Sequence, residues 1–446
     1  MIYELPRPRR TLRELGSLGL QSLHTFVLKA VYAALAVSAT LCAARLLSLD
    51  EFGAFSLLQS VAAIGAVLIT FGADQSRLRA VAQAGSHTGQ RGQLIQSALV
   101  VAAVNAAICL PFVWFGARLS VSDPLTISLL IVVYGLAIAT IRIVRGAMVG
   151  AGSIVRGQLF EMAWHPALIL AAISICWWLQ LATSARLLFA IIALTTVMVS
   201  FLAVVDGWFV IVRHDRTVGA AKVAQPISMR ETWALSFPFL AIALGNVAMS
   251  QVDIVMLGAL DSAEAAGIGR VLIRVADFAP FLLVAAAVPA SRWVARLKEL
   301  SESESNAFES RTRRMTALAT AFAVVFAALC LLFSDYVLGM FGSAFASYDG
   351  ELAIVLIGRV FFCVLGLPSV FLSMLGYSRQ LLISMLLGIL INVALNAVLI
   401  PDFGVAGAAV ATTISIVIWK ATAALSVWRL RQINITLFSG RWVTRP

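Results

Sequence analysis

Long apolar segments recur along this chain at a length that suits the thickness of a lipid bilayer. An α-helix needs about 20 apolar residues to cross the hydrocarbon core. We predict twelve such spans, at residues 24–47, 53–73, 94–117, 125–147, 159–181, 186–211, 233–258, 266–291, 315–339, 352–375, 380–400 and 404–428. Because 61% of the residues are hydrophobic and only 12% are charged, the chain has too little charge to cover a soluble domain. The sequence therefore predicts an all-α polytopic membrane protein with about twelve transmembrane helices.

The distribution of lysine and arginine predicts the orientation of these helices. An even number of spans places both termini on one side, and cytoplasmic connections carry an excess of Lys and Arg. With both termini in the cytoplasm, 25 of the 33 basic residues lie on that side and only Arg45, Arg118 and Arg186 lie in outer connections. The net charge of +11 then faces the anionic lipids of the inner leaflet. Membrane lipids, and not nucleic acid, are the partners that this charge predicts.

A weak internal repeat divides the chain into two halves of six helices. Ser48 to Gly53, after the first predicted span, matches Ser262 to Gly267, after the seventh. Because six is even, both halves share one orientation, which predicts two parallel-repeat six-helix bundles around a central cavity. We predict a basic tail, a bundle, a linker, a second bundle and a second tail, at residues 1–23, 24–213, 214–231, 232–428 and 429–446. This organisation favours a transporter that works by alternating access.

The stretch from Asn392 to Thr413 predicts a tight reversal between the last two helices. Proline lacks an N–H and glycine tolerates a positive φ, so the chain is expected to turn between Pro401 and Gly404. Small residues from Gly404 to Ala411 allow close approach of helix backbones inside lipid.

Three stretches at the corresponding helices carry a family resemblance. Arg45 to Gly53, Asp253 to Gly258 and Asn392 to Thr412 are similar to motifs of the polysaccharide-transport (Wzx-type) flippases. These flippases belong to the multidrug/oligosaccharidyl-lipid/polysaccharide exporter superfamily. One departure is that Ile268-Gly269 stands where members often carry a tyrosine.

The resemblance implies transport of an undecaprenyl-diphosphate-linked oligosaccharide from the inner to the outer leaflet of a bacterial cytoplasmic membrane. Such transport would feed O-antigen, capsule or exopolysaccharide assembly. A polysaccharide polymerase and glycosyltransferases would then be partner enzymes, and no cofactor is implied.

Ionisable residues at membrane depth are costly and are therefore the first candidates for a site. Arg270, Arg274 and Asp277 follow i, i+4, i+7 spacing on one face of the predicted eighth helix, with Asp253 on the seventh and Arg359 on the tenth. The planar guanidinium group binds phosphate oxygens with two hydrogen bonds, which suits a diphosphate. Alternatively, Asp253 and Asp277 pair with these arginines and only stabilise the bundle, or act as carboxylates that couple transport to an ion gradient. Three arginines against two aspartates leave a positive charge, and we predict that Arg274 and Arg359 face substrate.

Two lysines are further candidates for substrate binding. Lys29 lies near the cytoplasmic end of the first helix, where it either meets the diphosphate on entry or extends to the lipid headgroups. Lys420 lies deeper in the last helix and is predicted on the cavity wall. Arg142 and Arg145 are more typical of topology anchors, and Glu161 and Asp206 either face water or pair with a neighbouring arginine.

Neutral polar residues leave two interpretations open. Asn246, Gln251, Asn392 and Asn396 either hydrogen-bond sugar hydroxyls or join helices, the commoner role. His165-Pro166 inside the fifth span is more typical of a kink than of a proton-coupling histidine.

Motifs for enzyme chemistry are missing from the sequence. There is no phosphate-binding Gly-Lys-Ser/Thr loop, and the four histidines do not form a metal-ligand pattern with the cysteines. We therefore predict no catalytic or metal-binding residues and no enzyme activity. A cation-coupled drug exporter of the same superfamily and a non-transport component of polysaccharide assembly remain the alternatives.

Overall fold

The computed structural model describes residues 12–83, 99–111, 123–179, 181, 184–217, 229–295, 302–431 and 433–437, and all regular structure in these ranges is helical. Residues 1–11 of the predicted tail at 1–23, residues 218–228 of the predicted linker at 214–231 and the end of the chain at 438–446 lie outside the described residues. Much of the predicted third span lies outside them as well, so this span is described only as the apolar helix Leu99–Pro111.

The first half of the chain forms helices that follow the predicted spans closely. They are α1 (Leu12–Leu46), α2 (Leu49–Thr70), α3 (Ala73–Gln83), α5 (Pro124–Gly150), α6 (Ile154–Leu159), the π-helical segment η1 (Phe160–Trp164), α7 (His165–Leu179) and α8 (Ala185–Thr217).

The second half contains α9 (Met229–Leu260), α10 (Ala263–Ala276), α11 (Phe281–Ala295), α12 (Glu302–Leu332), α13 (Ser334–Gly339), η3 (Ser343–Phe345), α14 (Asp349–Val364), α15 (Pro368–Met374) and α16 (Ser378–Arg431). Within the described residues, eight helices are long and apolar enough to cross a membrane, and the pair α14 and α15, bent by 43°, would form a ninth span. The helix α16 counts once among the eight but reverses at Gly404, where φ is 53° and ψ is −127°. The predicted reversal between the last two spans is therefore confirmed.

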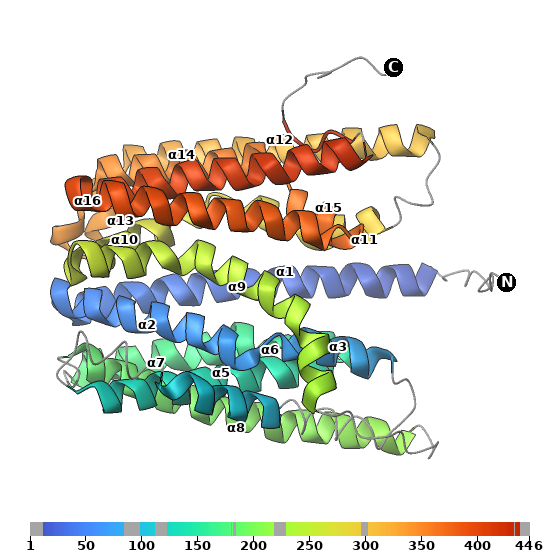
Figure 1. Ribbon diagram of the computed structural model, residues 1–446, viewed down its shortest axis with the longest axis horizontal. Coiled ribbons are helices and arrows are strands. Elements are labelled where there is room, and N and C mark those ends of the chain that lie inside the picture. The colour runs from blue at the N-terminus through green and yellow to red at the C-terminus, as the bar shows by residue number, and fades with distance from the viewer. Residues whose placement is uncertain are drawn as a thin grey trace.

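The helices run along the long axis of the molecule in two groups (Figure 1). In the first group α5 packs against α2, α3 and α8, and in the second α16 packs against α9, α14 and α15. The groups meet where α2 contacts α9 and α10. The start of α1 and the end of α16 lie at one end of the molecule, here called the terminal end (Figure 1). The α1–α2 connection and the reversal of α16 lie at the opposite end, here called the turn end (Figure 1).

The repeated Ser-to-Gly stretches form equivalent helix starts that contact each other across the two groups. The Ser48 hydroxyl accepts from the Glu51 N–H at 3.4 Å, and the Ser262 hydroxyl accepts from the Ala265 N–H at 3.1 Å, so each serine caps its helix. Five residues after each cap, Gly53 and Gly267 face each other where α2 crosses α10. A methyl group on Gly53 would overlap the carbonyl of Ala263, so the crossing requires glycine.

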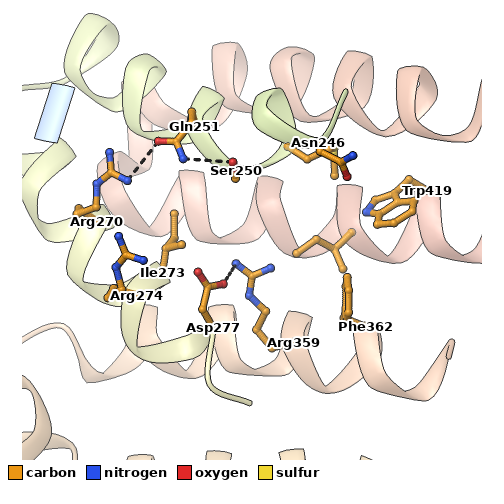
Figure 2. Close-up of a pocket in the computed structure, with 12 residues that line it drawn as sticks. Asn246, Ser250, Gln251, Arg270, Ile273, Arg274, Asp277, Arg359, Phe362 and Trp419 are labelled. Atoms are coloured by element: carbon orange, nitrogen blue, oxygen red, sulfur yellow. Dashed lines mark hydrogen bonds and ion pairs between the residues drawn. The ribbon is translucent and has the colours of Figure 1, made fainter. Parts of the chain in front are cut away.

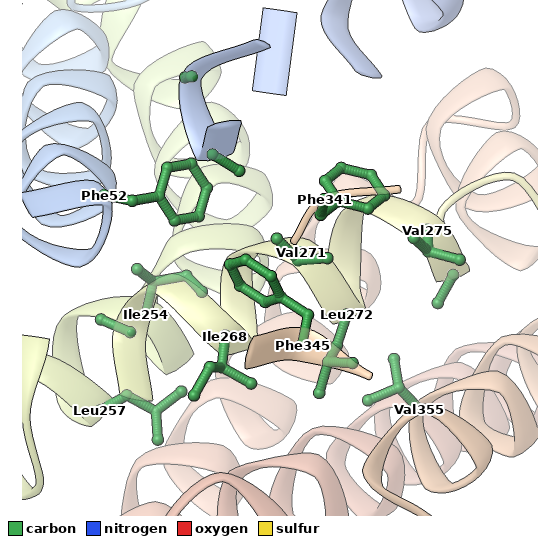
Figure 3. Packing of buried hydrophobic residues seen from close by; sticks show 14 of the residues in the cluster. Phe52, Ile254, Leu257, Ile268, Val271, Leu272, Val275, Phe341, Phe345 and Val355 are labelled. Carbon is green, nitrogen blue, oxygen red and sulfur yellow. The ribbon is translucent and has the colours of Figure 1, made fainter. Parts of the chain in front are cut away.

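Large apolar side chains surround this crossing and close the turn end. The rings of Phe52 and Phe345 meet edge to face with centroids 6.0 Å apart. Buried side chains of α9, α10 and α14 fill the rest of the cluster (Figure 3), among them Ile254, Leu257, Ile268, Val271, Leu272, Val275 and Val355. Arg45 adds hydrogen bonds to the carbonyls of Met340 at 2.7 Å and Gly339 at 3.3 Å. These contacts join the two groups at the turn end.

Two predicted spans are broken helices. The span predicted at 266–291 consists of α10 and α11, separated at residues 277–280, where Pro280 has no N–H for a continuous helix. The span predicted at 352–375 consists of α14 and α15, separated at Gly366, where φ is +72°. Non-helical backbone at membrane depth is tolerated where it is buried in protein or lines a cavity. Both breaks therefore indicate where polar groups gather inside the protein.

We predict that Gly53→Ala destabilises the protein although alanine favours helices. The added methyl group must push α2 and α10 apart, and overpacking of this kind costs about 1–3 kcal/mol. Thermal unfolding in detergent should show a lower Tm than wild type. Gly350→Ala on α14 is the matched control, because a methyl group there meets nothing within 4 Å. Equal melting of the Gly53 variant and wild type would contradict a close crossing.

Candidate functional site

Three arginines from two broken spans meet in one cavity. Arg270 and Arg274 come from α10, and Arg359 comes from α14. Together with Asp277, which follows α10, they line a cavity of about 220 Å³, here called the arginine pocket (Figure 2). The other lining residues come from α9, α10, α14 and α16: Asn246, Met249, Ser250, Gln251, Ile273, Phe362, Ile416 and Trp419.

Arg270 is buried and links the two helix groups. Its guanidinium donates to Gln251 Oε1 on α9 at 3.2 Å and to the carbonyl oxygen of Ser56 on α2 at 2.9 Å. It also donates to the hydroxyl of Ser60, one turn further along α2. None of these partners carries a charge, so the positive charge of Arg270 is hydrogen-bonded but not neutralised by them.

Arg359 and Arg274 differ in their partners. Arg359 forms an ion pair with Asp277, with Nη2 and Oδ1 2.7 Å apart (Figure 2). Arg274 forms no hydrogen bond or ion pair with another described residue. The Nε–H groups of Arg270, Arg274 and Arg359 are all buried without a described partner. Three arginines and one aspartate give the pocket a formal charge of +2.

Asp253 lies outside the arginine pocket, in a separate polar cluster between α9 and α16. Its Oδ1 accepts from the side-chain amides of Asn392 and Asn396, each at 2.8 Å. The Asn392 amide also lies 3.2 Å from the hydroxyl of Ser415. In the structure Asp253 is therefore bonded to amides, whereas Arg270 bonds to neutral groups and Arg274 to no described residue. Among the described residues, Asp253 forms no ion pair with Arg270 or Arg274. The ion pair that does form joins Asp277 to Arg359.

The two candidate lysines occupy different surroundings. Lys420 is buried, donates to the carbonyl of Gly366 at 2.7 Å and lies 3.5 Å from the ring centroid of Phe362. It thus satisfies a carbonyl freed by the break between α14 and α15 and lies next to two aromatic residues that line the arginine pocket, Phe362 and Trp419. Lys29 is half-buried on α1 and is not among the residues that line the three pockets described here.

A second cavity adjoins the arginine pocket on the side of the terminal end. This charged pocket, of about 380 Å³, shares Asn246 and Ser250 with the arginine pocket. Its four ionisable residues pair with one another. Arg142 donates to Glu161 at 3.2 Å, and Arg145 donates to Asp74 at 3.0 Å and to Glu161. Unlike the arginine pocket, this cavity is formally neutral.

Glu161 and Asp206, the two carboxylates predicted either to face water or to pair with an arginine, both pair with neighbouring arginines. Glu161 belongs to the π-helical segment η1, and such segments occur frequently at functional sites. Asp206 accepts from Nε of Arg156 at 2.9 Å.

A third cavity adjoins the arginine pocket on its other side. This aromatic pocket, of about 200 Å³, lies among α1, α2, α5 and α7 and shares Gln251, Arg270 and Arg274 with the arginine pocket. Its wall includes Tyr32, Phe52, Phe55, Gln59, Tyr134 and His165.

Sequence reasoning missed several residues of these pockets. Gln59 and Tyr134 were not singled out, although a polar side chain inside an apolar span is a signal by itself. Asp74 was missed because it falls just beyond the second predicted span, and Phe362 and Trp419 have no polar signature that separates them from lipid-facing aromatics.

Comparison with known protein families identifies one match. The sequence profile of the family described as "Polysaccharide biosynthesis protein" matches residues 21–291. No curated protein sequence matches the chain.

Solved structures share the fold at low sequence identity. The inward-facing conformation of a multidrug resistance MATE family transporter of the MOP superfamily has a TM-score of 0.71 and 13% identity, covering 92% of this chain and 96% of that chain. The outward-facing conformation of such a transporter has a TM-score of 0.66 and 15% identity, covering 94% and 95%. A MOP superfamily transporter from Pyrococcus furiosus, described by the reverse polarity of its binding pocket, has a TM-score of 0.66 and 14% identity, covering 93% and 95%. The chain therefore has the twelve-helix fold of these transporters, as the sequence predicted.

We predict that Glu161→Gln destabilises the protein by about 2 kcal/mol, because it removes the shared carboxylate of Arg142 and Arg145 from a partly buried network. The Tm in detergent should fall accordingly. Glu264→Gln is the control, since that carboxylate is exposed at the start of α10 and contributes less than about 1 kcal/mol. If both variants melt alike, the network has no stabilising role.

Proposed function

The chain belongs to the polysaccharide biosynthesis protein family, and from this we propose that it is a flippase for a lipid-linked oligosaccharide. The proposed substrate is an undecaprenyl-diphosphate-linked glycan, moved from the inner to the outer leaflet of the bacterial cytoplasmic membrane. The glycan would then enter O-antigen, capsule or exopolysaccharide assembly, with a polymerase and glycosyltransferases as partner enzymes.

One observation carries this proposal, the incomplete hydrogen bonding of three arginines in a pocket among α9, α10, α14 and α16. A buried guanidinium N–H without a partner costs free energy that a bound anion would recover. Arg274 forms no hydrogen bond or ion pair with another described residue, and the buried Nε–H groups of Arg270 and Arg359, which line the same pocket, have no described partner. A diphosphate carries enough acceptor oxygens to engage several arginines at once.

The arrangement of pockets suggests a route for alternating access. With the terminal end toward the cytoplasm, the diphosphate passes from the charged pocket to the arginine pocket while the polyprenyl tail stays in lipid. Release on the other side requires the contacts of Phe52 with Phe345 and of Arg45 with Met340 to separate. The bundles at 24–213 and 232–428 would move as units about the linker 214–231.

Two carboxylates are candidates for coupling this movement to a proton or sodium gradient. Asp277 is tied to Arg359, so a change in its charge would alter the arginine pocket directly. Asp253 is held between α9 and α16 by two asparagines, so a change in its charge would act on the packing of those helices.

A cation-coupled drug exporter is the second candidate, favoured by the fold shared with MATE transporters. The formal charge of +2 in the arginine pocket opposes it, because a cationic drug would be repelled there.

We predict that Arg274→Ala reduces glycan export at least tenfold. Loss of charge-assisted hydrogen bonds costs about 1.5–3 kcal/mol, equivalent to roughly 10–150-fold in affinity. The amounts of surface polysaccharide and of lipid-linked intermediates are measured in a deletion strain that is complemented with each variant in turn. Arg359→Ala should also reduce export, whereas Arg379→Ala on the exposed surface of α16 is the control.

Accumulation of completed lipid-linked units together with loss of surface glycan would support the flippase. Normal export by folded Arg274 and Arg359 variants would overturn the site assignment. Normal glycan in the deletion strain with increased sensitivity to cationic drugs would move the function to drug export.

A further inference from the structure

The aromatic pocket has the chemistry of a separate subsite next to the arginine pocket. Arg270 and Arg274 line both cavities, so a ligand held by these arginines borders the aromatic pocket directly. They are also the only charged residues in its wall, as the structure describes it. A group bound there would thus be neutral itself but attached to an anion.

The walls of this pocket combine aromatic faces with unoccupied neutral hydrogen-bonding groups. The ring of Tyr134 is held by Phe189 and His165, with centroids 5.7 and 6.5 Å away. Neither the Tyr134 hydroxyl nor the Gln59 amide bonds to another described residue, although both belong to helices inside the membrane. A polar side chain at this depth is costly unless a ligand or water satisfies it.

The hydrogen bonds of Thr196 determine which ring nitrogen of His165 carries the proton. The Thr196 hydroxyl donates its single proton to the carbonyl of Ile192 at 2.7 Å. The contact of 3.1 Å between Thr196 Oγ1 and His165 Nε2 therefore requires Nε2 to be the donor. In a neutral imidazole this leaves Nδ1 as an acceptor on a ring that lines the pocket. The residues that line the pocket thus include an amide that donates and accepts, a phenol and an imidazole with one acceptor nitrogen.

We propose that the aromatic pocket binds the sugar ring attached to the diphosphate. A sugar ring has apolar C–H faces that pack on aromatic rings and hydroxyl groups that need both donors and acceptors. Gln59, Tyr134 and His165 bond the hydroxyls, while Arg270 and Arg274 at the boundary hold the phosphates. The proposal rests on the flippase function and adds the site that distinguishes a sugar-bearing lipid from the bare lipid diphosphate.

The test measures binding of defined lipids to the purified full chain in detergent. The probes are a short polyprenyl diphosphate and the same lipid carrying one N-acetylglucosamine, N-acetylgalactosamine, glucose or galactose. Wild type should bind at least one sugar-bearing lipid more tightly than the bare diphosphate. Gln59→Leu should weaken binding of that lipid about tenfold and leave the bare lipid unchanged, and Tyr134→Phe should act in the same direction. Unchanged affinity for the bare lipid also shows that each variant is folded.

The outcomes separate this inference from the proposed function. If wild type binds all five lipids with equal affinity, the sugar subsite is overturned. It is also overturned if Gln59→Leu weakens binding of the bare lipid and of the sugar-bearing lipid equally. If Arg274→Ala still weakens binding of the bare lipid diphosphate in that case, the diphosphate site is retained. If wild type binds no lipid diphosphate better than a zwitterionic phospholipid, the flippase proposal itself fails.

Discussion

The crossing of α2 and α10 determines how the rest of the site is assembled. Because Gly53 and Gly267 have no side chains, the two helices approach with their backbones in contact. One consequence lies along α10, where Arg270 comes within hydrogen-bonding distance of Ser56 and Ser60 on α2. Small residues generally allow this kind of approach in membranes, where apolar surface alone gives helices little reason to associate. The same crossing joins the two helix groups at the turn end.

Breaks in the helices concentrate polarity further along α10 and α14. The break after Ala276 leaves Asp277 beside Arg359, and the break at Gly366 leaves a carbonyl that Lys420 satisfies. Polar backbone of this kind is stable in a membrane protein only when protein groups or water compensate it. Lys420 is therefore better understood as a support for the wall of the pocket, while the arginines supply its charge.

The two ionic regions have opposite electrostatic character. In the charged pocket Arg142 and Arg145 are matched by Asp74 and Glu161, so arginine and carboxylate neutralise each other. In the arginine pocket, Arg359 is the one arginine that has a carboxylate partner among the described residues. A buried charge without a counter-charge costs free energy. The arginine pocket holds such a charge, whereas the neighbouring charged pocket is built from the same residue types and is neutral. This contrast favours a functional role for the excess charge.

The sequence by itself determined the twelve spans, the reversal at Gly404, the equivalence of the two serine-capped helix starts and the concentration of arginine on α10 and α14. These features follow from local requirements, because lipid demands about 20 apolar residues per crossing and ionisable residues inside it are rare enough to be conspicuous.

Tertiary structure decided which charges meet. The i, i+4, i+7 spacing of Arg270, Arg274 and Asp277 defined a face of a helix but not the helix that this face contacts. Packing directed Asp253 toward Asn392 and Asn396, and the break before Pro280 turned Asp277 toward Arg359. The aromatic pocket arises only when α1, α2, α5 and α7 are assembled, since its residues are far apart in sequence. Rotation of each helix about its axis is set by side-chain packing with its neighbours, and a one-dimensional pattern does not contain that information.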